Sequence, residues 1–277
     1  MKIDPRLKLR RRSRVQGFTL LELVVVVAVL VILAGILLPK FDLFKLKANK
    51  GVAASNMTDV SRIIQTFYAQ NAVYPDNWDS LMLPGTGVTG GPLWDTTNAS
   101  TDGDQLEPQL VGGPPAAASP HKLVLGAPLV PGEARSLARI GITTVLDLDS
   151  TSTALPNDRF TLTNTRAIDT GTVLAALSTT DPDAIAITTH IYPNILPAGN
   201  TPPGKRLVVF GFGSHSTAIG NLVQEVPFYP NTDVTKYYSR FLAIFEVDDG
   251  GGRANLMAVV GADGDQIGDE IADYYER

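Results

Sequence analysis

The first strong pattern in the chain is an unbroken apolar run near its start. Residues 23–38 (LVVVVAVLVILAGILL) contain no charged or polar side chain, and residues 18–22 extend this run to 21 residues. At about 1.5 Å per residue, a helix of that length spans roughly 31 Å, which matches the roughly 30 Å hydrocarbon core of a bilayer. We therefore predict one transmembrane helix over residues 18–38.

A second pattern begins after Pro39, where apolar residues recur at helical spacing. These positions are Phe41, Phe44, Leu46, Val52, Val60, Ile63, Ile64, Phe67 and Tyr68. We expect the helix to continue through residues 39–73 as a soluble half. Proline removes one helix hydrogen bond and clashes with the carbonyl four residues earlier, which predicts a kink or local melting near Gly35–Pro39. In the alternative interpretation, Pro39 is simply the end of the membrane span.

Beyond Trp78, short apolar and β-branched runs alternate with turn residues, which indicates strands. The predicted strands lie at residues 121–130, 142–149, 184–192, 206–212, 239–247 and 255–262. Short helices are expected at residues 131–141 and 216–225. The predicted fold is α+β, with a long, kinked N-terminal helix packed on a mainly antiparallel β-sheet head, residues 74–277.

The charge of the chain is distributed unevenly. Of its 23 basic and 28 acidic residues, seven basic and one acidic lie in residues 1–17, a net charge of +6. The remaining 16 basic and 27 acidic residues give the rest of the chain a net charge of −11. An acidic body does not suit nucleic acid as a partner. The basic block before the apolar run places residues 1–17 in the cytoplasm and the head outside it, by the positive-inside rule.

A secretory signal peptide also combines a basic start with an apolar run. Here the run exceeds the usual length of about 7 to 15 residues, and no AxA cleavage site ends it. Glu22 lies inside the run, where a charged side chain costs on the order of 2.5 to 3.5 kcal/mol on insertion scales. A twin-arginine signal, suggested by RRRSRVQ, lacks the expected apolar pattern after the arginines.

The six residues from Gly17 to Glu22, GFTLLE, follow a short basic leader and open the apolar helix. This motif resembles the class III signal of the type IV pilin-like family, and most closely that of type II secretion pseudopilins. The resemblance implies that prepilin peptidase removes residues 1–17 by cutting between Gly17 and Phe18, and then methylates the new N-terminus. It also assigns assembly roles to Phe18, Glu22 and Pro39, the last being the helix-bending proline of the family.

A carboxylate within lipid needs a positive partner. In a stack of parallel helices, the amine of Phe18 is the nearest candidate for pairing with Glu22 of a neighbouring copy. The alternative is local: Thr19 and Glu22 have the spacing of a capping box at the helix start. The two interpretations are compatible in a free chain.

The segment Tyr74–Trp78 (YPDNW) places a tyrosine-proline step just after the long helix, as in many pseudopilins related to the major subunit. The head is longer than that of a typical major pseudopilin, and the chain has no cysteine for the C-terminal disulfide loop of type IV pilins. Major and minor subunits, and secretion pseudopilus and surface pilus, stay open at this point.

The strongest candidate for ligand chemistry is the acidic C-terminal stretch GADGDQIGDEIADYYER, which contains Asp263, Asp265 and Asp269. Carboxylates at alternating loop positions suit calcium, although the spacing is not that of an EF-hand. The alternative is a solvated acidic turn before a short helix. Two other stretches, TDGDQLE at residues 101–107 and GTGVTG at residues 85–90, are weaker candidates for calcium and for a nucleotide loop. The three histidines, His121, His190 and His215, fall in separate segments without a catalytic motif.

Together these observations predict a structural filament subunit and not an enzyme, with no required cofactor and calcium as the one candidate ion. Its expected partners are prepilin peptidase, copies of itself and other pilin-like subunits, and an inner-membrane assembly platform. Its expected location is the bacterial inner membrane, crossed once, with the head in the periplasm or in an extracytoplasmic filament. The alternative is a membrane-anchored enzyme or binding domain that keeps residues 1–38 as an uncleaved anchor.

Overall fold

A computed structural model describes residues 19–82, 122–149, 161–195, 197–230 and 238–276. The chain divides into two compact units, Met1–Leu46 and Lys47–Arg277. Residues 1–17, Phe18 and the stretches GTGVTG and TDGDQLE lie outside the described residues. The fold is α+β, with an N-terminal helix followed by a mainly antiparallel sheet, which confirms the predicted class.

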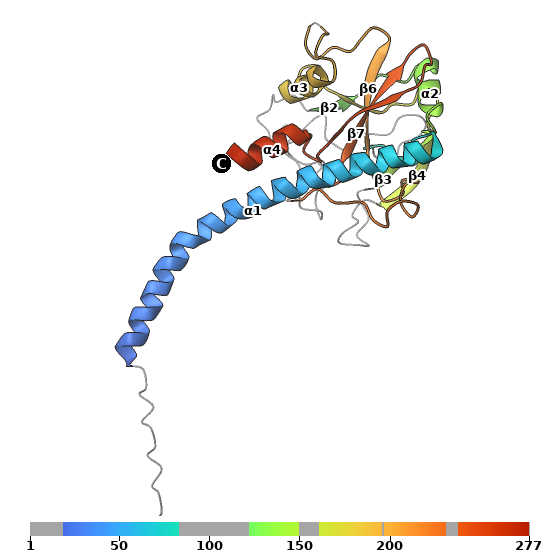
Figure 1. The fold of residues 1–277 in the computed structure, drawn as a ribbon. Coiled ribbons are helices and arrows are strands. Elements are labelled where there is room, and N and C mark those ends of the chain that lie inside the picture. Colours follow the sequence, from blue (N-terminus) through green and yellow to red (C-terminus); the bar gives the residue numbers. More distant parts are fainter. Residues whose placement is uncertain (1–18, 83–121, 150–160, 196, 231–237, 277) are drawn as a thin grey trace, which may run out of the picture. The chain divides into compact units, whose positions relative to one another are not determined.

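The dominant element is α1, Leu20–Asn71, a helix of 52 residues that runs through both units (Figure 1). Its backbone is helical at every residue from 20 to 71, including Pro39. The expected continuation of the helix past Pro39 is therefore confirmed, and the backbone does not melt there. The predicted kink stays a prediction.

In the part of the chain that the structure describes, no helix is long and apolar enough to cross a membrane.

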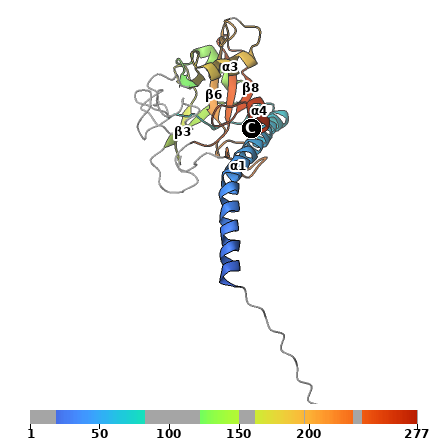
Figure 2. The same ribbon diagram turned by 90° about the vertical axis from the view of Figure 1, so that its left-hand side faces the viewer.

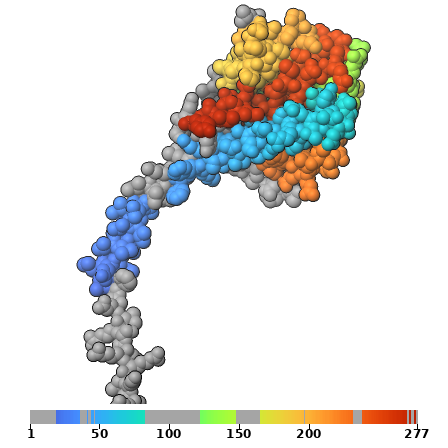
Figure 3. Space-filling view, viewed as in Figure 1, coloured from blue at the N-terminus to red at the C-terminus, as the bar shows by residue number. Residues whose placement is uncertain are grey.

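The second half of α1 is held by an apolar stripe on one side of the helix. Its buried residues are Ala53, Met57, Val60, Ile64 and Phe67. Their spacing of four, three, four and three residues keeps them on one helical face, which packs on the sheet. In the space-filling view, this part of α1 lies along the head beside the C-terminal residues (Figure 3). The stripe makes the second half of α1 part of the head's hydrophobic core.

The described residues of the head form eight strands around the central strand β6. These are β1 (Trp78–Asp79), β2 (Leu123–Leu125), β3 (Thr144–Asp149), β4 (Thr161–Ala167), β5 (Ala175–Leu177), β6 (Lys205–Gly211), β7 (Leu242–Asp248) and β8 (Asn255–Val260). One edge of β6 pairs with β7 along its whole length, and β7 pairs with β8. The other edge pairs with β5 and β1, which lead to β2 and to β3 and β4. The β1–β3 pair is parallel, and the other described pairs are antiparallel.

Both faces of the sheet are buried, as the alternation along β6 shows. Val208 and Phe210 face the cluster that includes the α1 stripe, whereas Leu207 and Val209 face a second cluster. That second cluster contains Ile187 of α3, Pro182–Ile191, so α1 and α3 cover opposite faces (Figure 2). The continuous burial of residues 207–211 in β6 is typical of a strand with cover on both sides.

The part of the head that the structure describes also contains three short helices: α2 (Pro131–Ala138), α3 and α4 (Ile267–Glu276). The helix α2 confirms the helix predicted at residues 131–141. The strand predicted at residues 184–192 is wrong, because this segment forms α3. Pro182 stands in its first turn, and the carboxylate of Asp181 accepts hydrogen bonds from the N–H groups of Asp183 and Ala184. These capping signals outweigh the β-branched composition.

Two further sequence predictions differ from the structure. Residues 216–225 form turns and an isolated bridge between Ile219 and Val223 in place of a helix. The strands β4 and β5 were not predicted, since β4 is rich in polar residues and β5 has only three residues.

The segment Tyr74–Trp78 connects α1 to the sheet. The carboxylate of Asp76 accepts hydrogen bonds from the N–H groups of Thr143 and Thr144, each at 2.9 Å, and from the Thr143 hydroxyl at 2.6 Å. Next to it, Trp78 is fully buried and its indole N–H donates to the Pro75 carbonyl at 2.6 Å. This turn therefore fixes the end of α1 against the loop before β3.

Trp78 is the centre of an aromatic cluster in the main core. Its ring centroid lies 5.4 Å from those of Phe212 and Phe245 and 6.2 Å from that of Phe210. We expect Trp78→Ala to lower the free energy of unfolding by about 3–5 kcal/mol, because it removes a large buried ring and leaves a cavity. Denaturant unfolding followed by circular dichroism measures this change. The control Val52→Ala, at a side chain that is 48% exposed, should shift it by less than about 0.5 kcal/mol.

Candidate functional site

The first turn of α1 is closed by reciprocal hydrogen bonds between Thr19 and Glu22. The carboxylate of Glu22 accepts from the Thr19 N–H and from the Thr19 hydroxyl, each at 2.9 Å. The N–H of Glu22 donates to the Thr19 hydroxyl oxygen at 3.3 Å. The capping-box interpretation is therefore confirmed for the single chain. Glu22 is also exposed, so the cap leaves its carboxylate accessible to a further partner.

The apolar side chains that follow Glu22 have little protein contact within the chain. Exposed fractions of the large hydrophobic residues between Leu20 and Leu33 range from 49% to 80%. They occupy successive positions of the helix, so apolar surface surrounds the helix axis on every side. An apolar surface of this extent marks a membrane or protein interaction site. Gly17 and Phe18, predicted as the processing site, lie outside the described residues.

The acidic stretch forms a tight turn between β8 and α4. Asp263 is 2% exposed, and its carboxylate accepts hydrogen bonds from the Tyr229 hydroxyl and from the N–H of Asp265. The N–H of Gly261 donates to the carbonyl of Asp265 at 2.9 Å, and Gly264 has a φ of +84°, which favours glycine. The turn thus brings Asp263 and Asp265 together.

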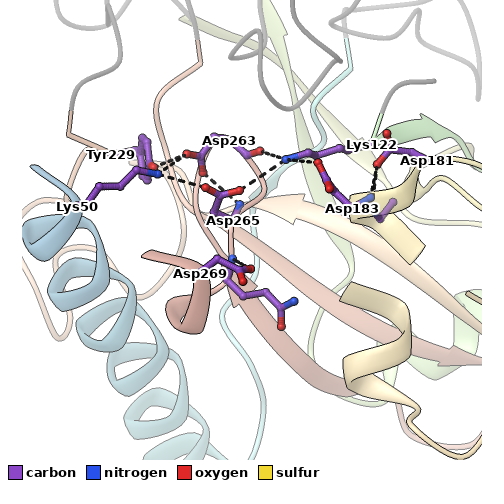
Figure 4. A network of polar contacts seen from close by, with 10 residues as sticks. Lys50, Lys122, Asp181, Asp183, Tyr229, Asp263, Asp265 and Asp269 are labelled. Carbon is purple, nitrogen blue, oxygen red and sulfur yellow. Dashed lines mark hydrogen bonds and ion pairs between the residues drawn. The ribbon is translucent and has the colours of Figure 1, made fainter. Parts of the chain in front are cut away.

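Two lysines from distant segments face these carboxylates (Figure 4). The Nζ of Lys50, on α1, lies 3.2 Å from a carboxylate oxygen of Asp265 and 3.6 Å from one of Asp263. The Nζ of Lys122 lies 3.6 Å from the Asp265 carboxylate, 3.3 Å from that of Asp183 and 3.0 Å from the Asp263 carbonyl. The acidic turn is therefore paired with ammonium groups of the same chain.

Asp269 makes a hydrogen bond of its own. Its carboxylate accepts a hydrogen bond from the N–H of Gln266 at 3.3 Å, at the start of α4. Within the described residues, no group of three or more acidic or histidine side chains is arranged to hold a metal ion. Calcium binding by Asp263, Asp265 and Asp269 stays a prediction.

Burial raises the pKa of Asp263 above its ordinary value of 3.8, and the neighbouring Asp265 carboxylate raises it further. The Tyr229 hydrogen bond and the charge of Lys50 oppose this rise. Removing a carboxylate from water penalises its charged form, which is the dominant cause here.

The sequence gives no sign that Lys50 and Lys122 pair with the carboxylates of the acidic turn. Lys50 and Asp265 are 215 residues apart, and lysine lacks the spacing signature of a metal ligand. His190 and His215 are exposed at separate places in the head, and His121 lies outside the described residues.

Residues 12–38 match the family described as the prokaryotic N-terminal methylation motif. The chain is also 31% identical over 70 residues to the type IV wide pilus major component PilA4 of Thermus thermophilus. That alignment covers 25% of this chain and 53% of the relative, so the chain spans about half the length of the curated relative it matches. No solved structure matches the chain.

The raised pKa of Asp263 predicts how the stability of the head depends on pH. The contribution of Asp263 to the free energy of unfolding is fully present below the ordinary pKa. It is lost as the pH rises through the raised pKa, because the carboxyl group then ionises in a buried site. Replacing Asp263 with Asn keeps a side-chain oxygen that accepts the Tyr229 hydrogen bond. Because Asn does not ionise, the variant does not lose stability as the pH rises. We expect D263N to gain stability relative to wild type as the pH rises from about 4 toward neutral.

Denaturant unfolding at several pH values measures this difference. Asp59→Asn, at an exposed position of α1, controls for the loss of one negative charge. A difference between D263N and wild type that is constant with pH, or that falls as the pH rises, would contradict the assignment.

Proposed function

We propose that this chain, whose N-terminal segment is of the type IV pilin-like family, is a structural subunit of a pilus-like filament. The observation that carries the proposal is the exposed apolar half of α1, which coincides with the methylation motif. A helix with apolar surface on all sides needs an apolar environment. Lipid before assembly and the helices of neighbouring subunits after assembly both meet this need.

The proposed maturation begins with removal of the basic leader. Prepilin peptidase would cut between Gly17 and Phe18 and methylate the new amine, in the inner membrane that the helix crosses once. The net charge of +6 on residues 1–17 supports a cytoplasmic leader. After the cut, the chain would begin with the amine of Phe18, four residues before Glu22.

The proposed assembly step uses Glu22 as the only charged residue between Phe18 and Leu38. Its carboxylate is exposed in the single chain, and Thr19 satisfies part of its hydrogen-bonding capacity. Pairing with the Phe18 amine of a neighbouring subunit would compensate the charge within an apolar filament core. Such a pair would also set the axial register of successive subunits.

Within this class, we propose a type II secretion pseudopilus, docked on an inner-membrane assembly platform together with other pilin-like subunits. The tyrosine-proline step at residues 74–75, which joins α1 to the sheet, supports this assignment. A surface pilus is the second candidate, favoured by the similarity to a wide pilus component. Deleting the gene separates the two: loss of protein secretion supports the pseudopilus, whereas loss of surface fibres with secretion intact supports the pilus.

The mass and N-terminal sequence of the chain purified from bacterial membranes test the maturation step. We expect a chain that begins with N-methylated Phe18, because residues 12–38 match the methylation motif. A chain that begins at Met1 would instead support an uncleaved anchor that carries an enzyme or binding domain.

Glu22→Ala should abolish filament assembly and leave the processed chain in the membrane, because it removes the carboxylate and keeps the apolar helix. Filaments are counted by electron microscopy after shearing, and the membrane fraction is assayed in parallel. The matched control is Thr19→Ala, which weakens the helix cap by about 1 kcal/mol but keeps the carboxylate. Normal filaments from the Glu22→Ala variant would refute the assembly role.

A further inference from the structure

One stretch of the acidic head exposes apolar side chains and carries no charge. Residues 123–132 (LVLGAPLVPG) contain no ionisable side chain, and six of them are exposed. The exposed residues, here called the β2 ridge, are Val124, Leu125, Ala127, Pro128, Val130 and Pro131. Val124, Leu125 and Val130 are 36%, 43% and 43% exposed. Exposed apolar side chains that are contiguous mark an interaction site more often than scattered ones do.

The backbone of the same stretch has an open strand edge. Among the described residues, β2 pairs with β5 alone. The N–H of Gly126 donates to Leu174 and the carbonyl of Lys122 accepts from Ser178, so the even-numbered residues bond inward. In an antiparallel ladder the alternate residues, Leu123 and Leu125, direct their N–H and C=O groups to the other edge. This edge can receive an extended segment of another chain.

A pocket of about 260 Å³ opens beside β2, between β5, α3 and the turn before β6. Val124, Leu125 and Leu177 line its apolar part, and Thr179 and Asn200 contribute polar groups. Its volume is below the roughly 300 to 1,000 Å³ of typical small-molecule sites. A single inserted side chain suits this space better than a separate ligand.

The wall of the pocket is fixed by Arg206. Its guanidinium donates to the carboxylate of Glu133 and to the carbonyl of Ala127, each at 2.6 Å. The carboxylate of Glu133 also accepts from the N–H of Val130 at 2.9 Å, so these bonds hold both ends of the turn after β2. The β2 ridge is therefore a supported surface.

The charge of the chain indicates which partner fits this surface. The chain after Gly17 has a net charge of −11, so two heads repel each other over most of their surfaces. An uncharged ridge is where two acidic heads can approach with the least repulsion, whereas a basic partner would bind more favourably elsewhere. A second copy of the same chain has the matching chemistry.

We propose that the β2 ridge and the open edge of β2 form a contact with the head of a second copy in the assembled filament. The inference rests on the proposed filament function and adds the residues through which heads meet. The contact supplies backbone hydrogen bonds at Leu123 and Leu125 and apolar burial at Val124 and Val130. Each contact is small, but many such contacts along the filament together stabilise the assembly.

The test places a photoreactive phenylalanine analogue at Leu125 in the full chain and irradiates intact filaments. The matched control carries it at Gln224, an exposed uncharged residue in another loop of the head. We expect a crosslinked dimer of the chain from position 125 and at least about tenfold less from position 224, equivalent to about 1.4 kcal/mol of preference. Mass spectrometry of the dimer identifies the partner segment.

The other outcomes overturn the inference. A crosslink from position 125 to a different protein, to lipid or to the same chain would show that another occupant covers the ridge, and no crosslink would show that nothing does. If wild-type filaments form and position 125 gives no crosslinked dimer, the proposed filament function is retained and the β2 contact is rejected. If wild-type chains form no filament, both fail.

A charge substitution provides an independent measurement. Val124→Glu should reduce filament yield by about tenfold, because it places an additional negative charge on the surface that meets another acidic head. Gln224→Glu adds the same charge elsewhere and should leave the yield within about twofold of wild type. Unchanged thermal unfolding and a Phe18 start in both variants separate the contact from folding and processing, and an unchanged yield from Val124→Glu would overturn the proposal.

Discussion

The helix α1 imposes the main constraint on this molecule, since its two halves differ in where their apolar side chains find partners. In the second half, a stripe from Ala53 to Phe67 packs against the chain's own sheet. Burying each large aliphatic or aromatic side chain of this stripe contributes about 1.5–3 kcal/mol. In the first half, the residues from Leu20 to Leu33 stay exposed on all sides of the helix. The same element thus stabilises the head and leaves an apolar surface that requires other molecules.

The lysine-aspartate network lies where the packed part of α1 begins. Lys50 is three residues before Ala53, the first buried residue of the stripe, and contacts the turn that precedes α4. Lys122 connects the same turn to Asp183 at the start of α3. The network therefore joins α1, the C-terminal segment and α3 through charge pairs; both lysines have little exposure to solvent, whereas the Asp183 side chain is 67% exposed. The ammonium group of Lys50 offsets part of the cost of burying the Asp263 carboxylate, whose pKa stays raised.

Formation of the proposed filament has to overcome electrostatic repulsion between acidic heads. The charge of −11 after Gly17 favours solubility of single heads and disfavours their close approach. Because the β2 ridge carries no charge, heads that meet there keep their acidic surfaces apart, which reduces the repulsion. The apolar half of α1 then supplies the larger part of the association energy in the proposed filament, and the head contact contributes geometry.

The sequence by itself determined the features that are local in the chain. The apolar run, the Thr19–Glu22 cap, the continuation of α1 past Pro39, the helix α2 and the α+β class all follow from residues that are neighbours or at fixed spacing. Local signals also misled: residues 184–192 have a β-branched composition, but Asp181 and Pro182 start a helix there. Only the tertiary structure decided the partners of the acidic turn, because Lys50 and Asp265 meet across 215 residues of chain. It likewise decided that β2 lies at the edge of the described sheet, since strand order depends on pairings between distant segments that no periodicity records.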